Sequence, residues 1–170
     1  MKAPGNQAKG FTIIELMVAL TIAATMMAFA IPAFNDFTTQ RRMAANVNAM
    51  IGAINYARSE AARLGATVTV QSMDASEAAN EWGEGFCIQV GDPGHCNDAL
   101  RRFQIEGDVT LNALGGLNGV DSMSFNSRGL LQGGLLGSMQ LCGQDTDDDP
   151  GRTININAIG RANIVDLTCF

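Results

Sequence analysis

The chain has 170 residues, enough for one domain with a hydrophobic core and too few for two. Its formal net charge at pH 7 is −6, and both of its lysines lie within the first ten residues. Because an acidic surface repels a polyanion, this charge disfavours non-specific binding to nucleic acids, although a local basic patch is not excluded.

A strongly apolar segment extends from Phe11 to Phe34, and residues 1–10 before it are polar and carry Lys2 and Lys9. As a helix, the segment would be about 36 Å long, enough to cross the ~30 Å hydrocarbon core of a bilayer. A secretory signal is cut after its apolar core, whereas the plausible cleavage site here, after Gly10, precedes it. We therefore expect the apolar helix to stay on the mature protein as a membrane anchor.

Glu15 is the only charged residue between Phe11 and Phe34. A carboxylate inside a membrane helix costs roughly 2–3 kcal/mol or more unless it is paired. No Lys, Arg or His follows it within the segment, so a partner must come from elsewhere. A free α-amine on Phe11 of a neighbouring subunit would serve, if the chain were cut after Gly10. The simpler alternative is a single-pass anchor that tolerates an acid near one membrane interface.

Residues 9–15, Lys-Gly-Phe-Thr-Ile-Ile-Glu, resemble the class III signal of type IV pilins and pseudopilins. The resemblance implies that a prepilin peptidase cuts after Gly10 and N-methylates Phe11. It also implies that Glu15 meets the N-terminus of an adjacent subunit during filament assembly. The expected partners are other pilins or minor pilins, the prepilin peptidase and an inner-membrane assembly platform.

Pro32 lies near the end of the apolar segment and removes one backbone hydrogen bond, which tends to kink a helix. This helix break could unwind locally when subunits pack into a filament. A proline that is merely tolerated near the membrane interface is the alternative.

The helix is expected to continue beyond Phe34 as an amphipathic half, residues 35–65, after the transmembrane half, residues 11–34. Apolar residues recur there in steps of three and four, which is typical of one buried helix face: Met43, Val47, Met50, Ile54, Ala57, Ala61 and Leu64. The opposite face carries Arg41, Asn48, Asn55, Ser59 and Arg63. Gly65 then supplies a stop signal.

Residues 66–170 lack a long helical stripe and predict six to eight short strands. The expected strands are 67–71, 86–90, 100–105, 109–111, 122–125, 135–141, 153–157 and 162–168, and residues 72–84 are a loop by composition. The fold class is therefore α+β. A long N-terminal helix packs against a C-terminal antiparallel β-rich domain, built as a sandwich or an open sheet.

Four cysteines lie beyond the apolar segment and fit two disulfides outside the reducing cytoplasm. Of the three possible pairings we favour Cys87–Cys96, which closes a short loop, and Cys142–Cys169, which ties down the C-terminus. Metal binding beside His95 is the alternative, but the spacing lacks a CxxC pair.

The soluble half resembles the GspH/FimT-type minor pseudopilins through four segments: 56–64, 82–86, 125–129 and the Gly160-Arg161 hairpin with Cys169. The resemblance implies a minor type IV pilin that primes a pilus or forms its tip. It places a single-pass anchor in the inner membrane and the C-terminal domain in the periplasm, and later in the pilus or pseudopilus at the cell surface. A minor pseudopilin of type II secretion is the alternative.

A DNA-binding pilin for natural transformation is a further alternative. In FimT-type pilins a GRxR motif in the last hairpin contributes to DNA binding, and this chain has Gly160-Arg161-Ala162-Asn163 there. Arg161 matches and Asn163 does not, while Arg152 could lie across the hairpin. DNA is therefore a disfavoured partner.

No enzyme constellation emerges, and we expect no catalytic residue, cofactor or metal site. His95 lies in a Gly/Pro/Asp turn, and Glu81 and Glu84 are better explained as residues of a solvated loop. The acidic run 145–149 imitates the first ligands of a calcium loop, but Pro150 and Ile156 stand where such a loop needs glycine and glutamate. A solvated hairpin tip is the preferred interpretation of this run.

Overall fold

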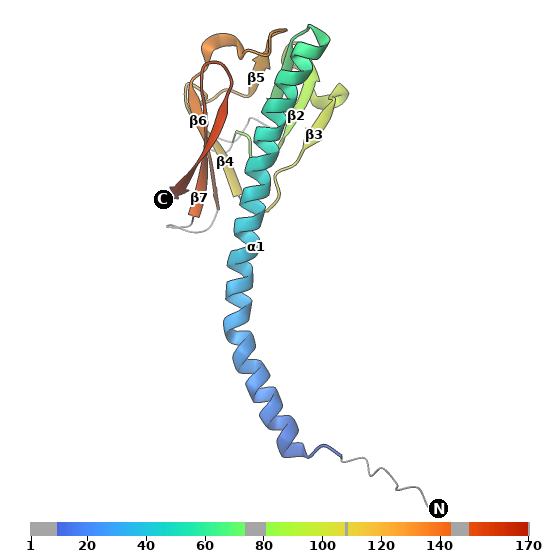
Figure 1. The fold of residues 1–170 in the computed structure, drawn as a ribbon, viewed down its shortest axis with the longest axis vertical. Coiled ribbons are helices and arrows are strands. Elements are labelled where there is room, and N and C mark those ends of the chain that lie inside the picture. The colour runs from blue at the N-terminus through green and yellow to red at the C-terminus, as the bar shows by residue number, and fades with distance from the viewer. Residues whose placement is uncertain (1–9, 74–80, 108, 144–149, 170) are drawn as a thin grey trace, which may run out of the picture. The chain divides into compact units, whose positions relative to one another are not determined.

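The computed structural model describes residues 10–73, 81–107, 109–143 and 150–169. The chain divides into two compact units, Met1–Thr38 and Thr39–Phe170. The single α-helix of the described residues, α1 (Ile13–Leu64), contributes to both units (Figure 1). Each unit is described by itself below.

The first unit consists, in its described part, of the start of α1 and the three residues that precede it. Its large apolar side chains are exposed, from Phe11 at 75% to Phe34 at 65%. Among the described residues, α1 is the helix long and apolar enough to cross a membrane, by length and composition. The helix continues through Pro32, so this proline does not end it.

The second unit begins with the amphipathic half of α1, whose predicted buried face is confirmed. Six of the seven predicted apolar residues are buried: Met43, Val47, Met50, Ile54, Ala57 and Ala61. The prediction for Leu64 is wrong, because this last residue of α1 is 42% exposed. Helical spacing places Leu64 on the correct face, but it lies at the helix terminus, where less of the β structure covers it.

Eight strands in two antiparallel sheets follow the helix in the described residues, which confirms the α+β class. The first sheet has the order β3-β2-β1-β5, with β1 at Val68–Ser72, β2 at Phe86–Val90, β3 at Arg101–Phe103 and β5 at Ser122–Phe125. The second has the order β4-β6-β7-β8, with β4 at Val109–Gly115, β6 at Gly137–Gly143, β7 at Pro150–Ile156 and β8 at Ala162–Thr168.

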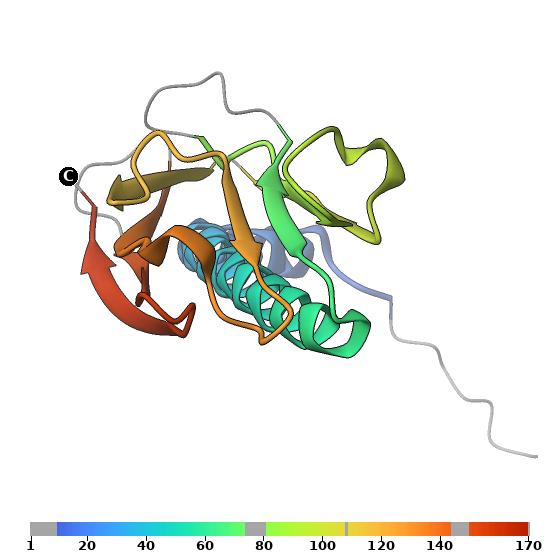
Figure 2. The same ribbon diagram turned by 90° about the horizontal axis from the view of Figure 1, so that it is seen from above.

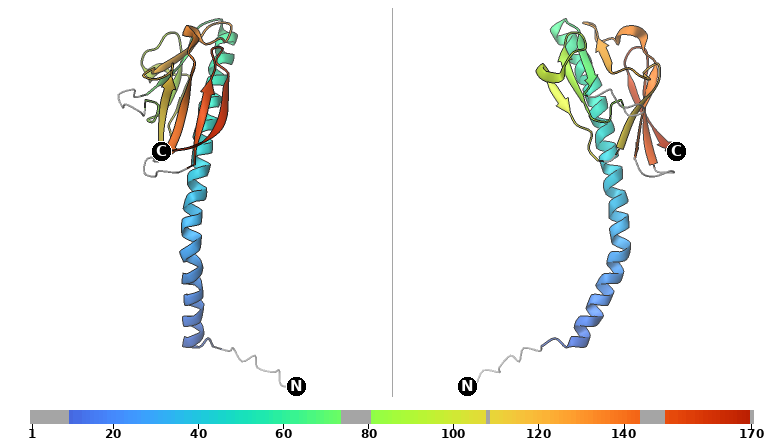
Figure 3. Two further views of the ribbon diagram at one scale, coloured as in Figure 1. Left: turned by 90° about the vertical axis from the view of Figure 1, so that its left-hand side faces the viewer. Right: turned by 180° about the vertical axis from the view of Figure 1, so that it is seen from behind.

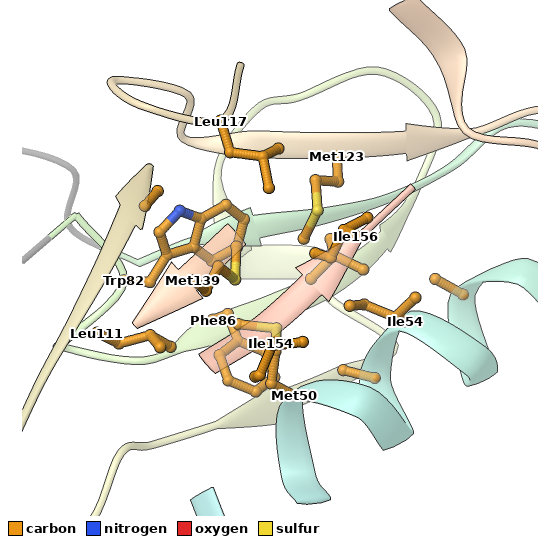
Figure 4. Close-up of a cluster of buried hydrophobic side chains, with 14 of the residues drawn as sticks. Met50, Ile54, Trp82, Phe86, Leu111, Leu117, Met123, Met139, Ile154 and Ile156 are labelled. Carbon is orange, nitrogen blue, oxygen red and sulfur yellow. The ribbon is translucent and has the colours of Figure 1, made fainter. Parts of the chain in front are cut away.

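The hydrophobic core joins α1 to both sheets. Seen from above, the soluble part of α1 lies alongside the two sheets (Figure 2), and the strands of the second sheet run roughly along it (Figure 3). Met50 and Ile54 of α1 meet Phe86 of the first sheet and Ile154 of the second in one cluster (Figure 4). Neither sheet therefore has a separate core.

The described end of the segment predicted as a solvated loop is instead part of the core. Trp82 is fully buried, and its indole Nε1–H donates to the carbonyl oxygen of Val120 at 3.1 Å. Glu81 is also buried, and its carboxylate accepts a hydrogen bond from the backbone N–H of Ala113 at 3.2 Å. The solvated-loop interpretation is wrong for Glu81, while Glu84 is exposed as expected.

Both predicted disulfides are confirmed. Cys87–Cys96 closes the loop between β2 and β3, and Cys142–Cys169 links the end of β6 to the residue after β8. The second bond therefore fixes the C-terminal strand to the middle of its sheet.

Arg58 of α1 connects the helix to a turn of each sheet. Its Nε–H donates to the carbonyl oxygen of Gly129 at 3.0 Å, and its Nη1 donates to that of Gly160 at 3.4 Å. Gly160 has a φ of 77°, and a Cβ added there would lie 2.6 Å from Cε1 of Phe125. Three segments that are far apart in the sequence thus meet around one guanidinium group.

We expect Arg58→Ala to lower the free energy of unfolding of the second unit by about 2 kcal/mol, because hydrogen bonds from a charged donor are among the stronger ones. Urea unfolding of the full-length protein in detergent can be followed by fluorescence of Trp82, the only tryptophan of the chain. Arg128→Ala, at an exposed arginine, is the matched control and should change stability by less than roughly 0.5 kcal/mol. Equal effects of the two substitutions would contradict this role of Arg58.

Candidate assembly site at the start of the helix

Thr12 caps the N-terminus of α1 and thereby orients Glu15. The backbone N–H of Glu15 donates to Thr12 Oγ1 at 3.3 Å, and the N–H of Leu16 donates to the Thr12 carbonyl oxygen at 3.2 Å. A threonine followed three residues later by glutamate is the pattern of a capping box. Thr12 and Glu15 are thus a sequence signal for the start of the helix.

Glu15 lies in the first turn of α1 and is exposed. The partial positive charge of a helix N-terminus stabilises a nearby carboxylate by roughly 0.3–1 kcal/mol at an exposed site. Among the ion pairs of the described residues, none involves Glu15. Among the described residues, the helix terminus is therefore the main source of positive potential for the carboxylate.

A shallow groove surrounds Glu15 on one face of the helix. Its lining repeats at helical spacing and is apolar except for the carboxylate: Phe11, Ile14, Glu15, Val18, Ala19 and Ile22. Such a face fits an apolar helix that presents a single positive charge. In hydrocarbon a pair of this kind is favoured, because neither charge has water as an alternative partner.

Gly10 and Phe11 precede the helix and are exposed, so the peptide bond between them is accessible. A Cβ built on Gly10 would meet no atom within 4 Å. The fold of this chain therefore does not require glycine at position 10. Any requirement for glycine there must come from another molecule that binds this segment.

The second candidate site, the hairpin β7–β8, keeps its two arginines apart. Arg161 lies beside the turn, where the Oδ1 of Asn157 accepts its backbone N–H at 2.8 Å. Arg152 pairs in register with Asp166, and its Nη1 lies 3.0 Å from Asp166 Oδ1. Four residues separate Arg152 from the end of β7, or about 14 Å at ~3.4 Å per residue. The hairpin does not bring the two cations together.

The arginine pair of β3 is also engaged within the chain. Arg101 lies over the ring of Tyr56, with its Cζ 4.6 Å from the ring centroid. Arg102 donates to the carbonyl oxygens of Cys96 and Asn97, the latter at 3.2 Å. Both arginines of β3 are therefore engaged by contacts within the second unit.

The other candidates do not form a site within the described residues. No group of three or more His, Cys, Asp or Glu side chains that could hold a metal ion occurs in this part of the chain. His95 is exposed, and its neighbour Cys96 is in a disulfide. The acidic run 145–149, considered above for calcium, lies outside the described residues.

Two family models match this chain. The model of the type II transport protein GspH covers residues 46–160, more than half of the chain. The model of the prokaryotic N-terminal methylation motif covers residues 5–31, which include Gly10, Phe11 and Glu15. The chain belongs to the GspH family. The two matches confirm the resemblance found in the sequence.

Two solved structures share the fold. The type IV minor pilin FimU of Pseudomonas aeruginosa (strain PAO1) aligns with a TM-score of 0.64 and 21% identity over 79% of this GspH-family chain and 99% of FimU. The minor pseudopilin EpsH of the Vibrio cholerae type 2 secretion system aligns with a TM-score of 0.51 and 9% identity over 73% and 96% of the two chains. At these identities the likeness concerns the fold alone.

Sequence relatives with curated descriptions match only in part. A type IV major fimbrial protein, FimA of Dichelobacter nodosus, is 48% identical over 40 residues. The match spans 24% of this chain and 25% of FimA, so the chain covers about a quarter of that relative's length. The family and fold neighbours are structural pilins rather than enzymes. The chain is therefore a pilin-like protein of the GspH family.

We expect a fragment of residues 39–170 to bind duplex DNA weakly or not at all, because Arg161 has no cationic neighbour in the hairpin. Asn163→Arg should strengthen any binding, and the gain should shrink as salt rises. Asn48→Arg, at an exposed position of α1, adds the same charge and is the control. Fluorescence anisotropy at low and physiological salt checks this. Micromolar binding by the unmodified fragment that Arg161→Ala abolishes would contradict it.

Proposed function

We propose that this chain is a minor type IV pilin that enters or primes a pilus filament, as an initiation or tip subunit. The observation that carries the proposal is the groove around Glu15, an apolar helix face with one carboxylate at its N-terminal end. The methylation motif matched at residues 5–31 supports processing of the same segment.

In this proposal the prepilin peptidase removes residues 1–10 and methylates Phe11. The processed N-terminus of an adjacent subunit then pairs with Glu15 inside the membrane. The pairing offsets the roughly 2–3 kcal/mol that the isolated carboxylate costs in hydrocarbon. Because charges interact strongly at low dielectric, the same pair would set the axial register of neighbouring helices.

We place the anchor in the inner membrane and the second unit in the periplasm, before the assembly platform transfers the protein to a pilus at the cell surface. The two disulfides support this orientation, because such bonds persist in oxidising compartments. The apolar start of α1 supports the membrane location.

A minor pseudopilin of type II secretion is the second candidate. It is favoured by the family model, which is that of a type II transport protein, and by the likeness in fold to EpsH. DNA uptake has less support, since Arg152 is paired with Asp166 and the chain is acidic.

Gly10→Val should leave an uncleaved, membrane-bound precursor. A prepilin peptidase must fit the residue before the cut into a narrow site, whereas the fold itself has space for a side chain there. Gly5→Val, another leader glycine, is the matched control and should be processed normally. Mass spectrometry of the N-terminus checks both variants. Normal cleavage and a methylated Phe11 in Gly10→Val would defeat this interpretation of the leader.

Glu15→Val should leave membrane insertion and cleavage intact, because it removes the only charge of the apolar segment. Pilus number should fall roughly tenfold, which corresponds to the loss of ~1.4 kcal/mol of assembly free energy. Asp36→Val, at an exposed acid further along α1, is the control and should assemble normally.

Electron microscopy of pili and a secretion assay in the same strains distinguish the pilus role from the secretion role. Loss of pili with normal secretion supports the pilus role, and the reverse supports the secretion role. Wild-type pili and secretion in a strain that carries only Glu15→Val would refute an assembly role for Glu15.

A further inference from the structure

The outer edge of β8 is the longest uncovered strand edge in the part of the chain that the structure describes. All seven residues of β8 pair with β7, from Ala162 opposite Ile156 to Thr168 opposite Pro150. Because β8 is the last strand in the order β4-β6-β7-β8, its other side has no strand neighbour (Figure 2). The backbone N–H and C=O groups on that side are available to another chain.

The other three sheet edges are short or covered. At β4, the carbonyl oxygen of Leu111 accepts the N–H of Trp82 at 3.2 Å, and the N–H of Ala113 donates to Glu81. The edge strand β3 has only three residues, Arg101–Phe103, and two of them are arginines. The edge strand β5 has four residues and ends in a bridge to Leu131. Proteins commonly protect sheet edges in these ways.

None of these protections is present on β8. The strand has no Lys, Arg or Pro, and its one charge, Asp166, is paired with Arg152. The adjacent residues Ile164 and Val165 point to opposite faces of the sheet, yet they are 39% and 48% exposed. An added strand would therefore find apolar contacts on both faces.

A groove adjoins the C-terminal half of β8. It lies between α1 and the ends of β7 and β8, and its lining is Gln40, Met43, Gly151, Arg152, Asp166, Leu167 and Thr168. When a peptide joins a sheet as a new strand, backbone hydrogen bonds provide affinity and pockets beside the edge select side chains. The groove and the edge together have the parts that such binding needs.

We propose that β8 accepts an extended strand from a different pilin-type subunit, which continues the second sheet. The inference rests on the proposed function, because it names the surface through which the subunit recognises a neighbour. An extended backbone matches the row of N–H and C=O groups at a strand edge, which otherwise bond to water. Since the chain carries 17 acidic residues against 11 basic ones, the added strand is apolar at alternate positions and is not acidic.

A second copy of this chain does not fit as the occupant. Two β8 strands that pair antiparallel are related by a two-fold axis perpendicular to the strands. The strands of the second sheet run roughly along the soluble part of α1 (Figures 1 and 3), so this axis would point the soluble parts of the two α1 helices in opposite directions. A second copy also carries the same excess of acidic residues, 17 against 11 basic ones, which disfavours its association with this chain.

The test is photo-cross-linking of the full-length protein in cells that assemble the filament. A photo-reactive phenylalanine analogue is placed at Val165 on the edge, or at Val90 as control, which is 49% exposed on the inner strand β2. We expect roughly fivefold more cross-linked product from position 165, since only there is a strand edge free. Mass spectrometry should identify another pilin-type subunit in that product.

Val165→Lys should reduce filament number severalfold, whereas Val90→Lys should not, because a lysine on an edge disfavours strand addition. Equal cross-linking at the two positions, or a product that contains only copies of this chain, would overturn the inference. A strain that lacks this chain distinguishes failure of the proposed function from failure of the proposal for β8. If deletion leaves pili and secretion unchanged, the proposed function fails; if it abolishes pili while cross-linking is equal, only the role of β8 fails.

Discussion

The guanidinium of Arg58 is the contact on which the arrangement of the second unit depends. It joins α1 to the turn at Gly129 after β5 and to the turn at Gly160 between β7 and β8, one turn from each sheet. Gly160 in turn packs on Phe125, at a distance that leaves no space for a side chain. This joint, together with the shared core and the Cys142–Cys169 disulfide, positions the last hairpin and with it the free edge of β8.

This joint gives a physical reason for motifs that are individually weak. The segments 56–64, 125–129 and 160–161 suggested the family in the sequence, and they meet at Arg58, Gly129 and Gly160. Their contacts around Arg58 hold the fold together. The same reasoning applies to Gly160-Arg161 in the hairpin: the glycine is needed for packing against Phe125, whatever the arginine does.

Local patterns predicted the elements well, because burial on one side imposes a period. The spacing of Met50, Ile54 and Ala57 predicted the buried face of α1, and β2, β5 and β8 have the predicted bounds. Patterns failed where burial depends on a distant partner. Glu81 is in a polar stretch, and its hydrogen bonds with Ala113 of β4 and Ser72 of β1 hold it inside. The division of eight strands into two sheets likewise depends on long-range pairing that no local period encodes.

The groove around Glu15 and the edge of β8 differ in how they would contribute to the assembly of subunits. A carboxylate in an apolar groove accepts any neighbour that brings a positively charged N-terminus on an apolar helix, so the contact at Glu15 fixes register but selects little. Selection requires groups that differ between subunits, such as the side chains that enter a groove beside a strand edge. A subunit that is present in few copies must bind particular neighbours. It therefore needs selective contacts more than a subunit that repeats along a filament. The unprotected edge of β8, costly in a protein that remains alone, is then explained by the neighbour that covers it.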